Sequence, residues 1–285
     1  MLPSPTHLRI RIVREVKKAL VDVTPPILLK PFRKKAKRPT GDTAEQLYAN
    51  SVEIGDQGPS EVVYLRGNPV FKLPVERLRY SGGISYFHDV HPMRIYYKQG
   101  VDALRQYYAK HQPSDILEKH FLTSTRRDGI SEGGVPWVID PPEKLVVVAE
   151  KGLEAEQHGV QHFGPVSEKK LLLEQSRLDL VRSSLESAGY QAKFGFSTGY
   201  FLENDKKDWV FVITGGQHRV AAMIDLGFTH APAQFHSAQP RIIRQSEISQ
   251  WPMVRNGSLT EAEAQGIFES FFDADRKLRF ATPVA

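Results

Sequence analysis

The sequence predicts a mixed α/β fold of the α+β kind, and three observations lead to that prediction. The run Trp209–Ile213 is apolar, β-branched and aromatic, which is the composition of a buried strand. A two-glycine turn follows, and apolar residues at helical spacing then run from Gln217 to a C-cap glycine at Gly227. Glu168–Ala188, which comes earlier in the chain, has the pattern of a long helix.

The composition is that of a globular protein. The chain has 285 residues, enough for one large domain or two modest ones, and 40% of them are hydrophobic. It has no cysteine, which excludes disulfides, thiol catalysis and thiolate metal ligands and fits a cytoplasmic location. It also lacks an apolar run of about 18 residues and an apolar signal core, so we expect neither a membrane span nor a secretory signal.

The basic excess lies in an N-terminal arm, residues 1–40. This arm holds eleven Lys and Arg residues and two acidic ones, so it carries +9, and the rest of the chain carries −4. An amphipathic helix at 7–23 and a basic cluster at 33–38 suit an anionic membrane surface, which would place the protein peripherally at the inner membrane. A helix packed on the body and a flexible tail are the alternatives. The acidic body makes nucleic acid the weakest candidate partner.

Residues 41–135 are predicted to form a small, aromatic-rich mixed α/β region. Helices are expected at Ala44–Ala49 and Val101–Lys110. Val62–Leu65 and Val70–Leu73, which flank a Gly-Asn-Pro turn, are expected to form a β-hairpin. The dense aromatic residues between these elements favour a packed core over a stacking platform for a sugar or base.

Residues 136–240 are predicted to form a second domain, and 241–285 a helical extension. In the domain we expect strands at Lys144–Ala149 and Ala233–His236. In the extension, a capping box at Ser258–Glu261 should open a helix to about Lys277. The apolar residues of the long helix that we expect to point inward are Leu172, Leu173, Leu178, Leu180, Val181 and Leu185.

Two histidine pairs have spacings that metal sites also use, His88 with His91 and His158 with His162. Neither pair has a third ligand in an expected pattern. We therefore expect structural or surface histidines, and no metal ligands are assigned.

The turn before Gln217 has the features of an anion site. A strand, two glycines and a helix start leave backbone N–H groups at the positive end of a helix dipole, where phosphate binds well. Arg219 offers a fork for two phosphate oxygens, and His218 can donate, accept or move a proton. The alternative is a tight connection followed by a surface arginine.

Gly215-Gly216-Gln217-His218-Arg219, with the Ala-Ala and Leu-Gly that follow it, resembles the signature of the ParB/sulfiredoxin-like superfamily. The resemblance covers about residues 144–237. Sulfiredoxins carry cysteine where this chain has Gln217, so sulfinate reduction is excluded. The free serine kinases carry Asp-Gly-His-His-Arg, and here Thr214 replaces the aspartate and Gln217 the first histidine.

The resemblance implies a nucleotide-dependent phosphotransferase that uses ATP or ADP, with CTP as the alternative, and Mg²⁺ on the phosphates. The implied nucleotide-binding residues are Thr214, Gly215, Gly216, Gln217, His218 and Arg219. Phosphoryl transfer also needs a group that accepts the proton of the acceptor hydroxyl. The kinases use a glutamate near the long helix, so His218, Glu174 and Glu168 are the catalytic candidates.

The acceptor expected from a membrane-associated arm is a small molecule or a lipid-linked sugar of bacterial surface-polysaccharide assembly. Two other functions remain open. One is a nucleotide-binding regulator of the ParB type that binds DNA, although only one convincing helix follows the domain. The other is a degenerate binding subunit. The sequence leaves the nucleotide, the acceptor, the general base and the oligomeric state undetermined.

Overall fold

The computed structural model of the chain describes residues 42–55, 58–80, 82–87, 90–124, 135–138 and 152–273. The described residues from Ala44 onward form one compact unit, to which the helices and strands belong. Several predicted features lie outside the described residues: the basic arm, the strand at Lys144–Ala149, His88, and the end of the last helix near Lys277.

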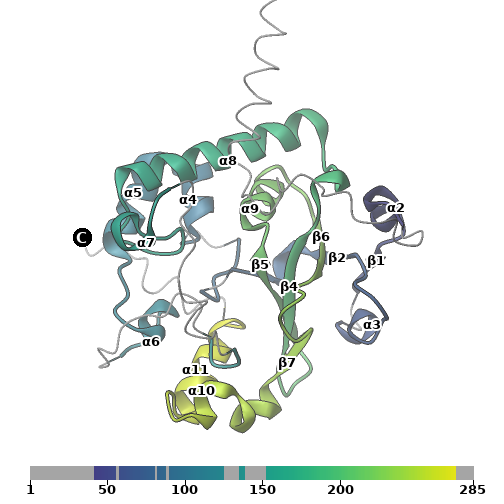
Figure 1. Ribbon diagram of the computed structural model, residues 1–285, viewed down its shortest axis with the longest axis vertical. Coiled ribbons are helices and arrows are strands. Elements are labelled where there is room, and N and C mark those ends of the chain that lie inside the picture. The colour runs from purple at the N-terminus through teal and green to yellow at the C-terminus, as the bar shows by residue number, and fades with distance from the viewer. Residues whose placement is uncertain are drawn as a thin grey trace, which may run out of the picture. The chain divides into compact units, whose positions relative to one another are not determined.

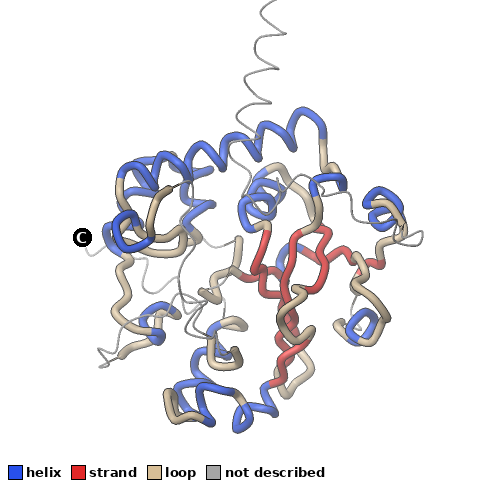
Figure 2. Tube along the Cα trace, viewed as in Figure 1, coloured by secondary structure: helices blue, strands red, loops and turns tan. Residues whose placement is uncertain are grey.

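The unit is built on a seven-stranded mixed sheet with the order β1-β2-β6-β4-β5-β3, in which β7 also pairs with β4 (Figure 1, Figure 2). The strands are β1 Val52–Glu53, β2 Phe71–Pro74, β3 Leu78–Arg79, β4 Ser197–Glu203, β5 Trp209–Gly215, β6 His230–Phe235 and β7 Ile242–Arg244. β4 and β5 are antiparallel, and β3 runs parallel to β5. The regions predicted at 41–135 and 136–240 thus contribute strands to the same sheet.

Helices surround this sheet. The α-helices are α2 Ala44–Ala49, α3 Ser60–Val63, α4 Pro92–Gln99, α5 Val101–Lys110, α6 Ile116–Lys119, α7 Ala155–His158, α8 Glu168–Ala188, α9 Gln217–Asp225, α10 Pro252–Arg255 and α11 Glu261–Ser270. The short 3₁₀ helices are η1 Val75–Arg77, η3 Ala192–Phe194 and η4 Gln245–Gln250. Within the described segments, no helix has both the length and the apolar character that crossing a bilayer requires.

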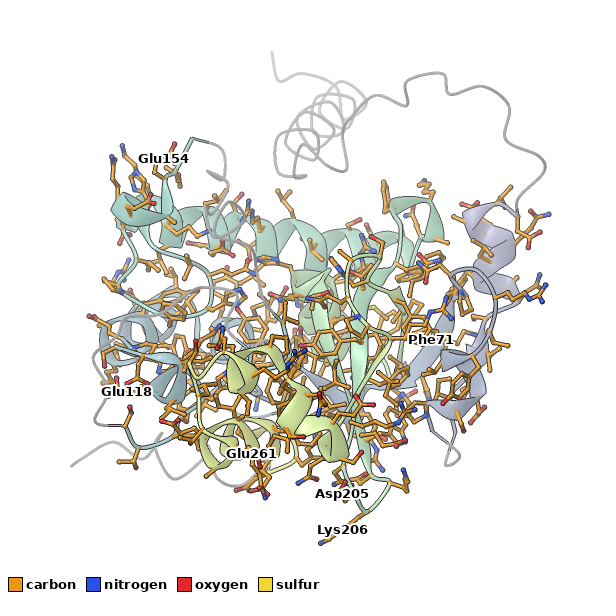
Figure 3. All side chains as sticks on the ribbon, turned by 60° about the horizontal axis from the view of Figure 1, so that its bottom comes forward. Phe71, Glu118, Glu154, Asp205, Lys206 and Glu261 are labelled. Atoms are coloured by element: carbon orange, nitrogen blue, oxygen red, sulfur yellow. The ribbon has the colours of Figure 1, made fainter. Side chains whose placement is uncertain are left out.

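Both faces of the central strands are buried. On one face Phe201 and Phe211 belong to a core cluster that includes residues of α8 and α9, and on the other Tyr200 and Val212 pack into a cluster with α11. Side chains of a strand alternate between faces, so a strand covered on both sides must be apolar throughout. Figure 3 shows the contrast with the β4–β5 turn, where Lys206 projects from the body.

The main helical predictions are confirmed. α2, α5 and α8 have the predicted bounds, and α8 ends at Gly189, whose φ of +65° suits a glycine after a helix. β5 is confirmed as a buried strand and continues two residues further than predicted, to Gly215. α9 begins at Gln217 as expected.

The predicted hairpin is wrong. Ser60–Val63 forms one helical turn, α3, and both of its valines are buried. Pro59 stands directly before it, a position where the fixed φ of proline favours a helix start over a strand. The second predicted arm is a strand, β2, but it pairs with β1 and β6. Arg241 holds the segment between them by donating to the carbonyls of Val63 and Leu65, at 2.9 and 2.6 Å.

Three further predictions need correction. The capping box lies two residues later than predicted, between Thr260 and Glu263, because Thr260 is the residue whose hydroxyl accepts from the third helical N–H. β6 spans His230–Phe235 instead of beginning at Ala233. On α8, Leu172 is 51% exposed, because the inward stripe follows Leu171, Leu178 and Leu185.

Candidate functional site

The corner between β5 and α9 needs both of its glycines. Gly216 is the N-cap of α9 and has φ +81°, a left-handed conformation that side chains disfavour. A Cβ on Gly216 would lie 2.8 Å from the hydroxyl oxygen of Ser197, and one on Gly215 would lie 2.5 Å from that of Thr198. Gly216 is exposed, so the start of α9 faces solvent at this point. This is the local geometry that the sequence predicted for an anion site.

Gln217 and Thr214 serve the protein interior. Gln217 is 6% exposed; its amide nitrogen donates to the carbonyl of Ile213 at 3.2 Å, and its amide oxygen accepts from Gln161 at 2.7 Å. The Thr214 hydroxyl donates to the carbonyl of Thr198 at 3.2 Å. These two predicted nucleotide-binding side chains therefore fasten the corner to its neighbours.

Arg219 is also engaged within the protein. Its guanidinium donates to the carbonyl of Gly195 at 2.5 Å and to that of Phe194 at 3.0 Å, and it lies 5.9 Å from the ring centre of Tyr190. The two carbonyls belong to the end of η3, where a helix leaves acceptors unsatisfied. The Arg219 guanidinium, which the sequence predicted to bind phosphate, thus holds the 190–195 segment against α9.

His218 and Glu174, two predicted catalytic residues, are brought together. The Nε2 of His218 lies 2.6 Å from Oε2 of Glu174, although 44 residues separate them in the sequence. The Glu174 side chain is 3% exposed and that of His218 is 18% exposed. Because Nε2 faces a carboxylate, we assign a proton to Nε2, which leaves Nδ1 as the ring nitrogen directed away from Glu174.

Glu174 also contacts two cations of its own helix. Its Oε1 lies 2.9 Å from Lys170 Nζ and 3.0 Å from Arg177 Nη1, and both of these side chains are buried. Burial by itself raises the pKa of a carboxyl, but His218, Lys170 and Arg177 outweigh it and hold the pKa of Glu174 well below its usual range. Glu174 is therefore ionised and a very weak base.

Glu168, the third catalytic candidate, lies elsewhere. It is exposed in the first turn of α8, where its Oε1 accepts from Arg105 at 2.8 Å. Six residues separate it from Glu174, which corresponds to about 9 Å along a helix and to a different face. The structure brings His218 and Glu174 together and leaves Glu168 out of the pair.

Two of the histidines expected to be structural or surface residues, His91 and His162, lie near this pair, together with Tyr80, which sequence reasoning did not assign to the site. His162 Nδ1 is hydrogen-bonded to the hydroxyl of Tyr80. Burial, with a smaller contribution from Lys119, lowers the pKa of His162 to about 3, so its ring is neutral. His91 is fully buried between Tyr80 and Tyr86, and among the residues that the structure describes neither of its ring nitrogens has a hydrogen-bond partner. The corner therefore adjoins a buried region rich in histidine and tyrosine.

The sequence does contain one signal for the buried charges. Leu171, Glu174, Leu178 and Leu185 recur at helical spacing, so Glu174 falls on the inward stripe of α8. Lys170 and Arg177 flank it at the (i, i+4) and (i, i+3) positions from which side chains on one helix meet. A charged residue on an apolar stripe indicates a buried, partnered group.

The second predicted histidine pair does not act as a unit. His158, the last residue of α7, has its Nδ1 2.8 Å from the hydroxyl of Ser167, whereas His162 turns to Tyr80. In the part of the chain that the structure describes, no group of three or more His, Cys, Asp or Glu side chains is arranged to hold a metal ion.

The polar arrangement at the corner suits proton transfer next to a bound anion. An ionised carboxylate fixes one side of an imidazole, and the other side is left for a proton, in the same logic by which a carboxylate orients a catalytic histidine. Comparison with protein-family models, with curated proteins and with solved structures gave no match, so this site is interpreted from its own geometry.

Proposed function

We propose that this protein is a nucleotide-dependent phosphotransferase of the ParB/sulfiredoxin-like kind, with its active site at the β5–α9 corner. The observation that carries the proposal is the 2.6 Å contact between His218 and buried Glu174 at the first turn of α9, next to exposed Gly216. The order α8, β5, corner and α9 agrees with the later part of the order that the superfamily resemblance implies, although β4 is an additional strand and the first strand of that order lies outside the described residues.

In this proposal the backbone amides at the start of α9 bind the nucleotide phosphates, and Mg²⁺ carried by those phosphates would supply further charge neutralisation. His218 accepts the proton of the acceptor hydroxyl at Nδ1 while that oxygen attacks the terminal phosphorus and the nucleoside diphosphate or monophosphate leaves. Glu174 orients His218 and stabilises its protonated form, because a carboxyl with so low a pKa does not take the proton itself. Glu174 is thus a positioning residue instead of the general base.

ATP or ADP is the proposed donor, with CTP as the alternative. The proposed acceptor is a small molecule or a lipid-linked sugar, and the proposed location is cytoplasmic, with the basic arm at an anionic membrane surface. The arm lies outside the described residues, so this part of the proposal rests on its charge pattern.

The test is nucleotide binding and phosphate release, with water standing in for the acceptor, measured for MgATP, MgADP and MgCTP. We expect His218→Gln to bind the nucleotide within about threefold of wild type and to lose roughly 100-fold in rate, the scale of one general base. Glu174→Gln should lose at least about tenfold in rate and flatten the pH–rate profile. Glu168→Gln is the matched control on the same helix and should leave both quantities unchanged.

The proposal fails if no nucleotide binds, or if the folded His218→Gln variant releases phosphate at the wild-type rate. Thermal unfolding of each variant separates loss of function from loss of fold.

A second candidate function is nucleotide binding without catalysis. This function is favoured by the position of Arg219. Its guanidinium is hydrogen-bonded to the carbonyls of Phe194 and Gly195, so it is not directed at a phosphate that would be transferred. Tight binding by the wild type together with no phosphate release would support this function over the first.

A further inference from the structure

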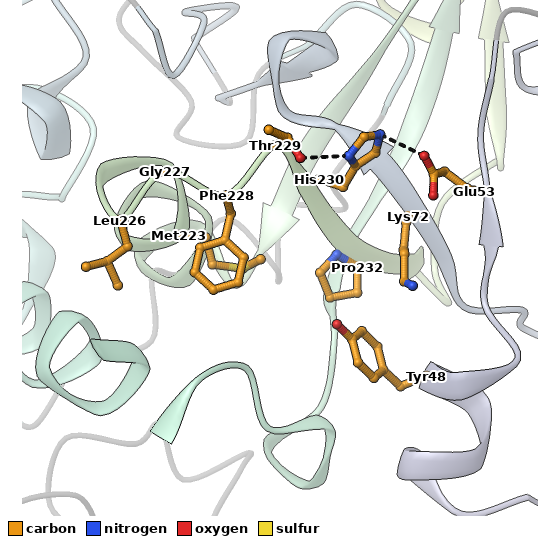
Figure 4. A pocket seen from close by; sticks show the side chains of 10 residues that line it. All are labelled: Tyr48, Glu53, Lys72, Met223, Leu226, Gly227, Phe228, Thr229, His230 and Pro232. Atoms are coloured by element: carbon orange, nitrogen blue, oxygen red, sulfur yellow. Dashed lines mark hydrogen bonds and ion pairs between the residues drawn. The ribbon is translucent and has the colours of Figure 1, made fainter. Parts of the chain in front are cut away.

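A second concave site lies at the opposite end of α9. It is a pocket of about 510 Å³, within the size range of small-molecule sites. The last turn of α9 and the start of β6 form one side, and residues from α2, β1 and β2 form the other (Figure 4). The candidate active site is at the first turn of α9, so the two sites share no lining residue.

One wall of the pocket is apolar. Met223 comes from the last turn of α9, Leu226 directly follows the helix, and Phe228 lies in the loop to β6. Met223 is 1% exposed and belongs to the core, whereas Leu226 and Phe228 are only partly buried and pack against it. Figure 4 shows the ring of Phe228 facing the open space across from Tyr48. This wall suits the flat, apolar body of a ligand.

The opposite wall is polar and has one cation. Lys72 Nζ lies 5.2 Å from the ring centre of Tyr48, and both side chains line the pocket. The carboxylate in the lining, Glu53, is directed to His230, with 3.2 Å between Oε1 and Nε2. Among the described residues no carboxylate pairs with Lys72, which is held only over an aromatic face. A partly buried ammonium in this position attracts an anion.

We infer that this pocket binds a small aromatic carboxylate, with its ring between Phe228 and Tyr48 and its carboxylate on Lys72. The ring buries apolar area against Phe228 and Met223, and the carboxylate gives Lys72 a charge-assisted hydrogen bond. A cationic ligand fits less well, because Glu53 already accepts from His230 and Lys72 repels a second positive charge. The inference stands apart from the proposed phosphotransferase activity, since it uses neither His218 nor Glu174.

The test uses indole-3-propionate as the anionic probe and its uncharged amide as the matched ligand, titrated into the full-length protein by calorimetry. We expect wild type to bind the carboxylate roughly tenfold more tightly than the amide, the effect of one hydrogen bond to a charged group. Lys72→Gln should remove this preference and leave amide binding unchanged. Lys206→Gln, a lysine exposed on the β4–β5 turn, is the control and should behave as wild type.

Phe228→Ala should weaken both probes equally, because it removes the apolar wall and leaves the charge on Lys72 in place. Nucleotide binding by Lys72→Gln should match wild type, which distinguishes this site from the β5–α9 corner. The inference is overturned if wild type binds the two probes equally, or if Lys72→Gln retains the preference for the carboxylate.

Discussion

The two ends of α9 differ in how their polar groups are satisfied. At the first turn, Gln217, His218 and Arg219 all have partners inside the protein, and Glu174, the partner of His218, also contacts Lys170 and Arg177. At the last turn, Lys72 faces a pocket and its ammonium lies only over Tyr48. The difference teaches that the first end is preorganised by internal bonds, whereas the second end keeps a charge available for a ligand.

The largest expected effect is at Glu174. Glu174→Ala should lower the free energy of unfolding by about 3–5 kcal/mol, because Lys170 and Arg177 lose their contact with a buried carboxylate. Urea unfolding at pH 7 measures it. Glu168→Ala on the same helix should change the free energy by less than about 0.5 kcal/mol, since its ion pair is exposed. Equal effects at the two glutamates would mean that the contacts of Glu174 are worth no more than an exposed ion pair.

The second effect is a dependence of the free energy of unfolding on pH. The pKa of His162 is lowered to about 3 in the folded state, mainly by burial, so below pH 6.5 the unfolded chain binds a proton that the folded chain does not. The free energy of unfolding should therefore fall by about 1.4 kcal/mol per pH unit for this group as the pH drops from 6.5 towards 3. Urea unfolding at pH 7, 6 and 5 should show a smaller slope for His162→Gln than for wild type.

A smaller effect distinguishes the two glycines that flank α9. Gly216 and Gly227 have nearly equal φ values of +81° and +84°, but a Cβ meets Ser197 at the first and nothing within 4 Å at the second. Gly227→Ala should cost about 1 kcal/mol for the left-handed conformation alone, and Gly216→Ala about 2 kcal/mol or more. Thermal unfolding of both variants tests this, and equal costs would mean that Ser197 moves aside freely.

The smallest effect is expected at Lys72. Lys72→Gln should lower the free energy of unfolding by about 0.5–1 kcal/mol, because its contact with Tyr48 is a partly exposed cation–π interaction. Denaturant unfolding without ligand measures it. A loss above about 2 kcal/mol would mean that Lys72 is structural and not reserved for a ligand.

The parts of the fold that sequence could predict are those set by local patterns. The Glu168–Ala188 helix has a serine N-cap and a glycine just past its end, so both of its bounds follow from short-range chemistry. The strand, the two-glycine turn and the helix at 209–225 are fixed in the same way. Val62 and Val63 show the limit, because their β-branched side chains favour a strand while Pro59 and the core favour a helical turn.

The sequence indicated which residues belong to the candidate site, but it did not predict the contacts between them. The Gly-Gly-Gln-His-Arg segment indicated His218 as a catalytic candidate, and the long helix indicated Glu174. Their contact depends on how α8 packs against α9, which a single sequence does not specify. The same holds for Arg219. No residue near it in the sequence indicates that its guanidinium donates to the carbonyls of Phe194 and Gly195.

The shortness of α9 has a consequence for both sites. Nine hydrogen-bonded residues make a stiff rod of about 13 Å, with His218 near one tip and Leu226 just past the other. Glu174 belongs to a different helix, so a displacement of the rod changes the separation between the carboxylate and the imidazole. A ligand in the pocket that displaced α9 through Leu226 would therefore also change the distance between His218 and Glu174.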